Sequence, residues 1–205
     1  MKRGGFIIGI EGVDAVGKRT QSLLLENWFK QNGFECIVIS FPDYGTPIGK
    51  EIKAFLSGER DFPPEVRHIL FAANRWEKAS IIRRYQKEAK AIIVNRYTES
   101  NLVYGLANGL SIDWLAALEK GIPQTDLVIV LDAPPKLLDS RRSNKDSYEK
   151  SQGLQAKTSS LYKELASRFG WRVIDATGSV EEIHNRIVSL ITNSRLIKRD
   201  EGEAH

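Results

Sequence analysis

Five runs of apolar residues, rich in Ile and Val, recur along the chain. They occupy residues 6–10, 35–40, 91–94, 127–131 and 171–174. Apolar runs that do not alternate with polar positions are typical of strands buried on both faces of a parallel sheet. The pattern therefore predicts five buried strands in one sheet.

The segments between these runs carry helical periodicity, which predicts the order β-α-β-α-α-β-α-α-β-α-α-β-α. This order is typical of a doubly wound α/β domain, in which a five-stranded parallel sheet has helices on both faces. No repeat or linker divides the sequence, so we expect one domain over residues 1–195 and a frayed polar tail over residues 196–205. Ligands of such a domain bind at the carboxyl ends of the strands.

The first apolar run leads into a glycine-rich segment and then into a helical pattern. The segment fits the phosphate-binding P-loop, in which Gly-Lys follows a first glycine after four free positions. Glycines let backbone N–H groups point inward, the helix dipole adds positive potential, and the lysine brings a charge to the outer phosphates of a nucleotide. A chance glycine-rich turn is the alternative. The predicted ATP-binding residues are Gly12, Val13, Asp14, Ala15, Val16, Gly17, Lys18, Arg19 and Thr20.

Composition narrows the class of protein. The 205 residues are 41% apolar and 27% charged, as in ordinary soluble domains, and no apolar run approaches the roughly 20 residues of a membrane span. The net charge of +4 suits a phosphorylated substrate but is too small and too scattered for a nucleic-acid binder. The single cysteine, Cys36, lies in a predicted strand and is expected to be a core thiol. Because the first strand begins so early, we expect no signal peptide and a cytoplasmic location.

Three further positions carry candidate binding residues, each with a plain structural alternative. Tyr44 offers a phenol in the loop after the second strand, where a packing role is the alternative. Phe71 and Arg75 share one face of a helix predicted over residues 64–89 and could stack on a base and bond its edge, or could be a core residue and a surface residue. Arg96 follows the third strand. It could bind a second phosphate group, or it could be an ordinary surface arginine.

A basic segment over residues 141–151 lies between two predicted helices. Its charges and turn-forming residues suit a short mobile lid, from which Arg141 or Arg142 could close onto a transferring phosphoryl group. A solvated charged face is the alternative. After the last strand, Ser179 and Glu182 have the spacing of a helix capping box, which is a structural role.

Taken together, in this order and at these distances, the motifs resemble those of thymidylate kinases from residue 7 to about residue 191. The matching segments are IEGVDAVGKRTQ, FPDYGTPIG, LFAANRWE, NRYTESNLVYG, the basic lid ending in SYEK, and DATGSVEEI. The resemblance implies a P-loop NTPase fold and ATP-dependent phosphorylation of dTMP to dTDP, with Mg²⁺ as the cofactor. It also implies a homodimer.

The resemblance also implies roles for individual residues in phosphoryl transfer. Lys18 would lie on the β/γ side of the ATP phosphates, and Arg96 would bind the phosphate of dTMP. Asp14 resembles a carboxylate of the family that lies near the acceptor's sugar and the magnesium ion. Arg141 and Arg142 would clamp phosphates at the moment of transfer.

A second set of implied roles concerns the acceptor nucleotide. Phe71 would stack on thymine while Arg75 bonds its edge, and Tyr44 lies in the loop that flanks the dTMP phosphate. Asn101 and Tyr104 fall where the family lines the base and deoxyribose. Tyr104 would then exclude a ribose 2′-hydroxyl.

Three positions depart from the family pattern. Ala15 replaces an arginine that some members carry in the P-loop, which shifts weight to the lid arginines. Arg19 stands where the general P-loop pattern has Ser or Thr, so the hydroxyl near Mg²⁺ is assigned to Thr20. Asn95 replaces an aspartate near the magnesium ion and loses a charge that attracts the cation. The predicted metal site is thus Thr20, Asp14 and Asn95.

Two alternative functions remain open at this point. One is another P-loop kinase of a nucleotide or small molecule. The other is a nucleotide-binding module with weak catalysis, suggested by Asn95.

Overall fold

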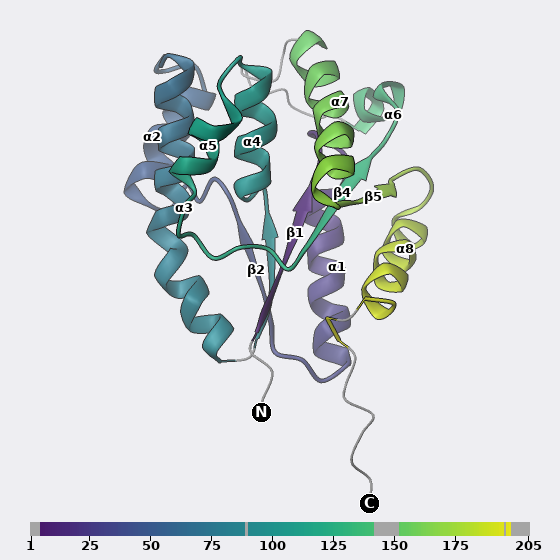
Figure 1. The fold of residues 1–205 in the computed structure, drawn as a ribbon. Helices are drawn as coiled ribbons and strands as arrows, with labels where there is room; N and C mark the ends of the chain where they lie inside the picture. The colour runs from purple at the N-terminus through teal and green to yellow at the C-terminus, as the bar shows by residue number, and fades with distance from the viewer. Residues whose placement is uncertain (1–4, 89, 142–151, 195, 198–205) are drawn as a thin grey trace, which may run out of the picture.

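The computed structural model describes residues 5–88, 90–141, 152–194 and 196–197. Strands and helices follow each other in the predicted order (Figure 1). The strands are β1 (Phe6–Glu11), β2 (Cys36–Ser40), β3 (Ala91–Asn95), β4 (Leu127–Asp132) and β5 (Arg172–Asp175). The helices are α1 (Lys18–Gln31), α2 (Pro47–Leu56), α3 (Pro64–Lys87), α4 (Thr98–Ala107), α5 (Ile112–Leu118), α6 (Pro135–Arg141), α7 (Gln152–Phe169) and α8 (Val180–Thr192).

The described residues form one five-stranded sheet in the order β2-β3-β1-β4-β5. All four strand pairings are parallel, and the register places Ile10 of β1 beside Asn95 of β3 and Ile129 of β4. β1 is therefore the central strand. The chain forms β2 and β3 on one side of β1 and then crosses to form β4 and β5 on the other side. A crevice at such a point is where open α/β sheets bind their ligands.

Helices cover both faces of the sheet and bury its apolar side chains. α1 and α8 pack on each other over one face, while α3, α4 and α7 cover the other (Figure 1). Ile8 and Ile10 of β1 are completely buried, as is Ile129 of β4. The buried thiol of Cys36 lies in the same core, and burial raises its pKa to about 12. Among the described residues, no helix is both long enough and apolar enough to span a bilayer.

The last strand differs from the prediction in its burial. β5 exists at the predicted place, but Val173 is 45% exposed and the strand is mostly open to solvent. The reason is its position, since β5 is an edge strand with a neighbour on one side only. Leu196 and Ile197, which the sequence analysis assigned to the tail, pack against the core; the rest of the tail lies outside the described residues.

The ends of the helices confirm the local signals where they are described. Ser179 caps α8 by accepting the N–H of Glu182, whose carboxylate accepts the N–H of Ser179 in return. This confirms the capping box. The box fixes the loop between β5 and α8 at the carboxyl edge of the sheet, on the side of β1 occupied by β4 and β5.

Candidate active site

The loop between β1 and α1 has the backbone of a phosphate cradle. Gly12 and Gly17 adopt φ values of 129° and 102°, which a side chain strongly disfavours. A Cβ at residue 12 would lie 2.4 Å from the carbonyl oxygen of Leu131, so the loop packs directly on β4. Ala15 also has a positive φ, of 63°. The loop then opens into α1, which places the positive end of a helix dipole at its concave side.

Lys18, the first residue of α1, spans this loop. Its Nζ donates to the carbonyl oxygens of Gly12 and Val13 at 2.8 and 2.7 Å and lies 3.7 Å from Oδ1 of Asp14. The side chain is nearly buried, so the ammonium charge is fixed against the inside of the loop. Arg19 and Thr20, by contrast, are exposed.

Arg96 joins the P-loop to the end of β3. Its guanidinium forms an ion pair with the carboxylate of Asp14 and lies 5.3 Å from the ring centre of Tyr104. The backbone at Arg96 has a φ of 55°, which is rare for a residue with a long side chain. Strained backbone of this kind clusters at functional sites, where the surroundings impose it. Here it directs a cation to the edge of the P-loop.

Beside this ion pair lies a cavity of about 330 Å³. It opens next to the P-loop, on the side of α3 and α4, and every residue predicted to bind the acceptor nucleotide lines it. These residues are Asp14, Tyr44, Phe71, Arg75, Arg96, Asn101 and Tyr104. The sequence therefore identified side chains from five separate segments that the fold brings together.

A buried ion pair fixes one of the residues that line the cavity. Nε of Arg75 donates to Oε2 of Glu119 at 3.1 Å, and the Nη2 of the same guanidinium bonds Oε1. Asn101 donates its amide N–H to that same Oε1 at 2.7 Å. Arg75 and Glu119 are only 2% and 5% exposed, so the charge of each is compensated by the other. The pairing fixes one edge of the guanidinium and determines which N–H groups can face a ligand.

His68 completes this network from α3. Its Nδ1 lies 2.7 Å from Oδ1 of Asn101, whose amide nitrogen is already a donor, so His68 carries its proton on Nδ1. The Nε2 atom then accepts from the amide of Asn108 at 3.4 Å. Complete burial, and to a lesser degree the charge of Arg75, lowers the pKa of His68 to about 4. The imidazole is neutral at neutral pH and serves as a fixed donor.

Sequence reasoning missed both Glu119 and His68. Glu119 ends a short helix next to a lysine and a glycine, where a solvent-exposed acid is the ordinary interpretation. For His68 there was a signal, because residues 68, 71 and 75 share one face of α3 at spacings of three and four. A histidine on the face that carries Phe71 and Arg75 belongs to the same site.

The asparagine at the end of β3 is held by hydroxyl groups. Oδ1 of Asn95 accepts from Ser22 of α1 at 2.6 Å, and its Nδ2 donates to Ser40 of β2 at 3.0 Å. The amide thus has a donor and an acceptor that suit it, without a charged partner among these contacts. No cluster of three or more His, Cys, Asp or Glu that could bind a metal occurs in the part of the chain that the structure describes.

The predicted lid is described only at its start. Arg141, the last residue of α6, donates from Nη1 to the carbonyl oxygen of Ala176 at 3.3 Å. This contact joins the end of α6 to the loop between β5 and α8. Arg142 and residues 143–151 lie outside the described residues.

Comparison with known proteins shows which family the chain is similar to. The model of the thymidylate kinase family matches residues 10–187. A probable thymidylate kinase of Thermococcus onnurineus is 39% identical over 95% of this chain and 100% of its own length. The thymidylate kinase of Dictyostelium discoideum is 35% identical, over 93% of this chain and 86% of its own. The chain belongs to the thymidylate kinase family. A solved thymidylate kinase structure from Candida albicans superposes with a TM-score of 0.83 at 29% identity, over 92% of each chain.

Membership of the thymidylate kinase family confirms the predicted enzyme class and reaction, the phosphorylation of dTMP to dTDP with ATP. The P-loop NTPase fold is confirmed as well. Neither alternative function is favoured. The cavity beside the P-loop lies at the carboxyl ends of β1 and β3, the edge at which open α/β sheets bind ligands.

Proposed function

We propose that dTMP occupies the cavity beside the P-loop and receives the γ-phosphoryl group of ATP bound in the loop. The observation that carries this assignment is the position of Asp14. This residue belongs to the P-loop, lines the cavity and pairs with Arg96. The two sites therefore share a wall, and an acceptor phosphate at Arg96 lies beside the donor's phosphates.

The walls of the cavity suit thymine. The ring of Phe71 provides a flat apolar surface for stacking, and the guanidinium of Arg75 provides donors at the end of the cavity. Because a guanidinium carries donors only, it pairs with the carbonyl group at position 4 of thymine or uracil and finds no acceptor on the amino group of cytosine. Tyr104, which is 7% exposed, closes the cavity near Arg96 and leaves little room for a 2′-hydroxyl.

Transfer itself needs positioning and charge compensation. The oxygen of the dTMP phosphate is already an anion, so it attacks the γ-phosphorus without a general base, and the bond to the bridging oxygen of ADP breaks in line. Lys18 stabilises charge on the β- and γ-phosphates, and Arg96 orients the acceptor. Arg141 and Arg142 would clamp the phosphates at the moment of transfer.

The residues around the loop fit a magnesium ion shared with substrate phosphates. Mg²⁺ commonly binds through one or two carboxylates, with phosphate oxygens and water completing its shell. Asp14, whose side chain is 38% exposed, and the exposed hydroxyl of Thr20 offer such oxygens. Asn95 would act through the hydroxyl groups that it contacts. A bound ion would neutralise part of the charge on the transferring phosphoryl group.

An acceptor panel tests this proposal. ADP release is measured with Mg·ATP and each of dTMP, dUMP, dCMP, AMP and thymidine. Rapid turnover with dTMP, at about 1–100 s⁻¹, slower turnover with dUMP and none with the others is the expected result. Preference for dCMP or AMP would contradict the assignment of Arg75 to the base.

We also infer a homodimer through α3. Ile69 and Trp76 are 45% and 41% exposed, and their spacing of seven residues places them on one face of this helix. Large apolar side chains that share an exposed face suit a second protein surface. Light scattering tests this assignment, because Ile69→Glu should convert a dimer into a monomer.

A further inference from the structure

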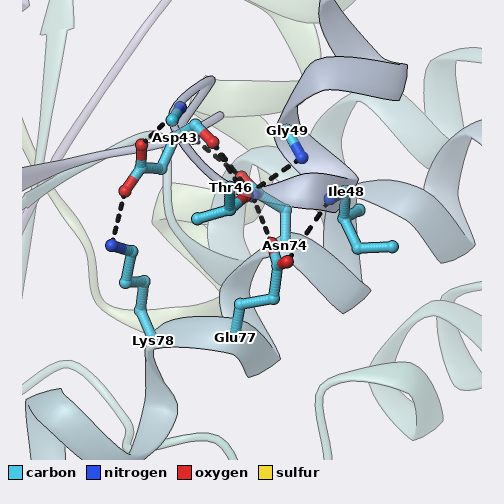
Figure 2. Close-up of polar contacts among 8 residues, drawn as sticks. Asp43, Thr46, Ile48, Gly49, Asn74, Glu77 and Lys78 are labelled. Atoms are coloured by element: carbon cyan, nitrogen blue, oxygen red, sulfur yellow. Dashed lines mark hydrogen bonds and ion pairs between the residues drawn. The ribbon is translucent and has the colours of Figure 1, made fainter.

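The segment between β2 and α2 is attached to α3 by a buried carboxamide. Asn74, which is 1% exposed, accepts the backbone N–H of Asp43 on Oδ1 at 2.8 Å. Its Nδ2 faces Oγ1 of Thr46 at 2.8 Å, Oε2 of Glu77 at 2.9 Å and the carbonyl oxygen of Asp43 at 3.3 Å (Figure 2). Both ends of the amide are thus used, and only an amide has a donor and an acceptor at these two places.

The same contacts fix the start of α2. Thr46 is the N-cap of this helix, where its Oγ1 accepts the N–H of Gly49 at 3.0 Å and donates to the carbonyl oxygen of Asp43 at 3.0 Å. Glu77 accepts the N–H of Ile48 at 3.3 Å. At the loop's outer side, Lys78 forms an ion pair with Asp43 at 2.7 Å (Figure 2). Asn74 joins these contacts to α3, because its carboxamide bonds Asp43, Thr46 and Glu77 together.

The loop held in this way is a wall of the acceptor cavity. Phe41, Pro42 and Tyr44 line the cavity from the loop, and Asn74 lines it from α3. The next residue, Arg75, also lines the cavity, and it pairs with Glu119 at the end of α5. Consecutive residues of α3 therefore hold two different parts of the cavity lining, the β2–α2 loop through Asn74 and Glu119 through Arg75.

We propose that Asn74 is a positioning residue for the acceptor, which sets the loop of residues 41–46 at the distance from Arg75 that dTMP requires. Holding a binding wall in advance saves the free energy that ordering it would cost when the ligand arrives. The hydrogen bonds of Asn74 given above are to Asp43, Thr46 and Glu77, and none of these is to the P-loop. This inference rests on the assignment of dTMP to the cavity.

Steady-state kinetics of Asn74→Asp tests the inference in the full-length enzyme. The substitution keeps the shape and the acceptor for Asp43, but it removes the donor and sets a carboxylate against Glu77. We expect the KM for dTMP to rise about tenfold or more while the KM for ATP changes by less than about twofold, because one or more buried hydrogen bonds are lost from the acceptor wall only.

A compensating variant separates positioning from simple destabilisation. In the double variant Asn74→Asp/Glu77→Gln the donor moves from residue 74 to residue 77, so the two side chains match again, and part of the KM for dTMP should be recovered. Asp126→Ala is the matched control. It removes a hydrogen bond to the N–H of Ile7 at the opposite ends of the strands and should lower Tm with both KM values unchanged.

Each outcome decides between defined alternatives. Equal changes in the KM for dTMP and ATP, or no change in either, would overturn the role of Asn74 while leaving the acceptor site in place. Should Asn74→Asp fail to fold, Thr46→Val removes the same contact from the loop side and must raise the KM for dTMP alone. Failure of the unsubstituted enzyme to phosphorylate dTMP would overturn the site assignment and, with it, this inference.

Discussion

The two halves of the active site are built in different ways. The P-loop is one continuous segment whose function lies in its backbone, with Gly12 and Gly17 at positive φ and Lys18 bonded to the loop's own carbonyls. The acceptor cavity is assembled from separate helices and loops, and buried side-chain pairs such as Arg75–Glu119 hold it together. One half is local in sequence, and the other depends on tertiary packing.

This difference has a consequence for how each half responds to substitution. A backbone cradle keeps its shape when a side chain is lost, so changes there should act on charge and on turnover. The cavity depends on paired buried groups, and the loss of one partner leaves the other without compensation. Changes in the cavity should therefore lower both dTMP affinity and stability.

The largest effect is expected at the P-loop lysine. Lys18→Ala removes the fixed positive charge from the cradle and should lower kcat at least about a hundredfold, in line with the loss of a preorganised electrostatic contact. Because the glycine backbone remains, Tm should change little. Single-turnover assays with Mg·ATP and dTMP measure the effect. A variant with near-normal turnover would show that the loop does not bind the transferring phosphates.

The second prediction concerns the buried pair of the cavity. Glu119→Gln leaves the guanidinium of Arg75 buried beside a neutral amide, which should lower the free energy of unfolding by roughly 3 kcal/mol and raise the KM for dTMP more than tenfold. Urea denaturation and initial-rate kinetics measure the two effects. The KM for ATP should stay within about twofold, because a defect confined to the cavity does not reach the donor site.

A double variant makes this test specific. Arg75→Met/Glu119→Leu replaces the pair by apolar side chains of similar size, which should restore stability because no charge remains buried. Binding of dTMP should stay weak, since the donor to the base is gone. If the single variant Glu119→Gln bound dTMP normally, the pair would be structural only.

The same difference explains what the sequence could predict. The order of elements followed from apolar runs and helical periodicity, and the P-loop followed from the spacing of Gly12, Gly17 and Lys18, because these signals are local. The exposure of Val173 did not follow, since an apolar run does not reveal whether its strand lies at the edge of the sheet. Strand order is decided by packing over the whole chain.

For the site, residues that line the cavity were predictable, and the residues that support them were not. Phe71 and Arg75 stood out through helical spacing and the family motifs. Glu119 has no such motif, and it is buried only because α5 returns to α3 in the folded chain. Residues that support another side chain carry no motif of their own. Their only signal in the sequence is a shared helix face, and His68 has this signal because it lies on the same face of α3 as Phe71 and Arg75.

A third prediction uses the pH dependence of stability. His68 has a pKa of about 4 in the folded protein, below its ordinary value of 6.5, because burial disfavours the imidazolium. The unfolded chain takes up this proton first, so the contribution to stability is full above pH 6.5 and is lost as the pH falls toward 4. The loss over this window is about 3 kcal/mol.

Denaturation curves between pH 8 and pH 4 measure this effect against a matched variant. His68→Gln keeps a donor for Asn101 but does not titrate, so its stability should fall less steeply over the same window. Identical slopes for the two proteins would mean that His68 is accessible to protons in the folded state. The acceptor cavity would then be less rigid than its network of buried hydrogen bonds implies.

The smallest effect is expected where the two halves meet. Asn95 lies at the end of β3, bonded to Ser22 behind the P-loop and to Ser40 at the start of the acceptor loop. Asn95→Asp adds a negative charge near the proposed magnesium site, so the Mg²⁺ concentration for half-maximal rate should fall by roughly threefold to tenfold. Both serines can donate to the new carboxylate, and Tm should therefore change little.

Titration of the rate with Mg²⁺ at fixed ATP and dTMP tests this, with Asn95→Ala as the control that removes the hydrogen bonds without adding charge. A lower Mg²⁺ concentration for half-maximal rate in the aspartate variant alone would mean that the charge of residue 95 affects Mg²⁺ binding. Equal requirements in all three proteins would place the ion entirely on Asp14, Thr20 and the substrate phosphates. Among the protein residues, only those of the P-loop and the start of α1 would then bind the metal.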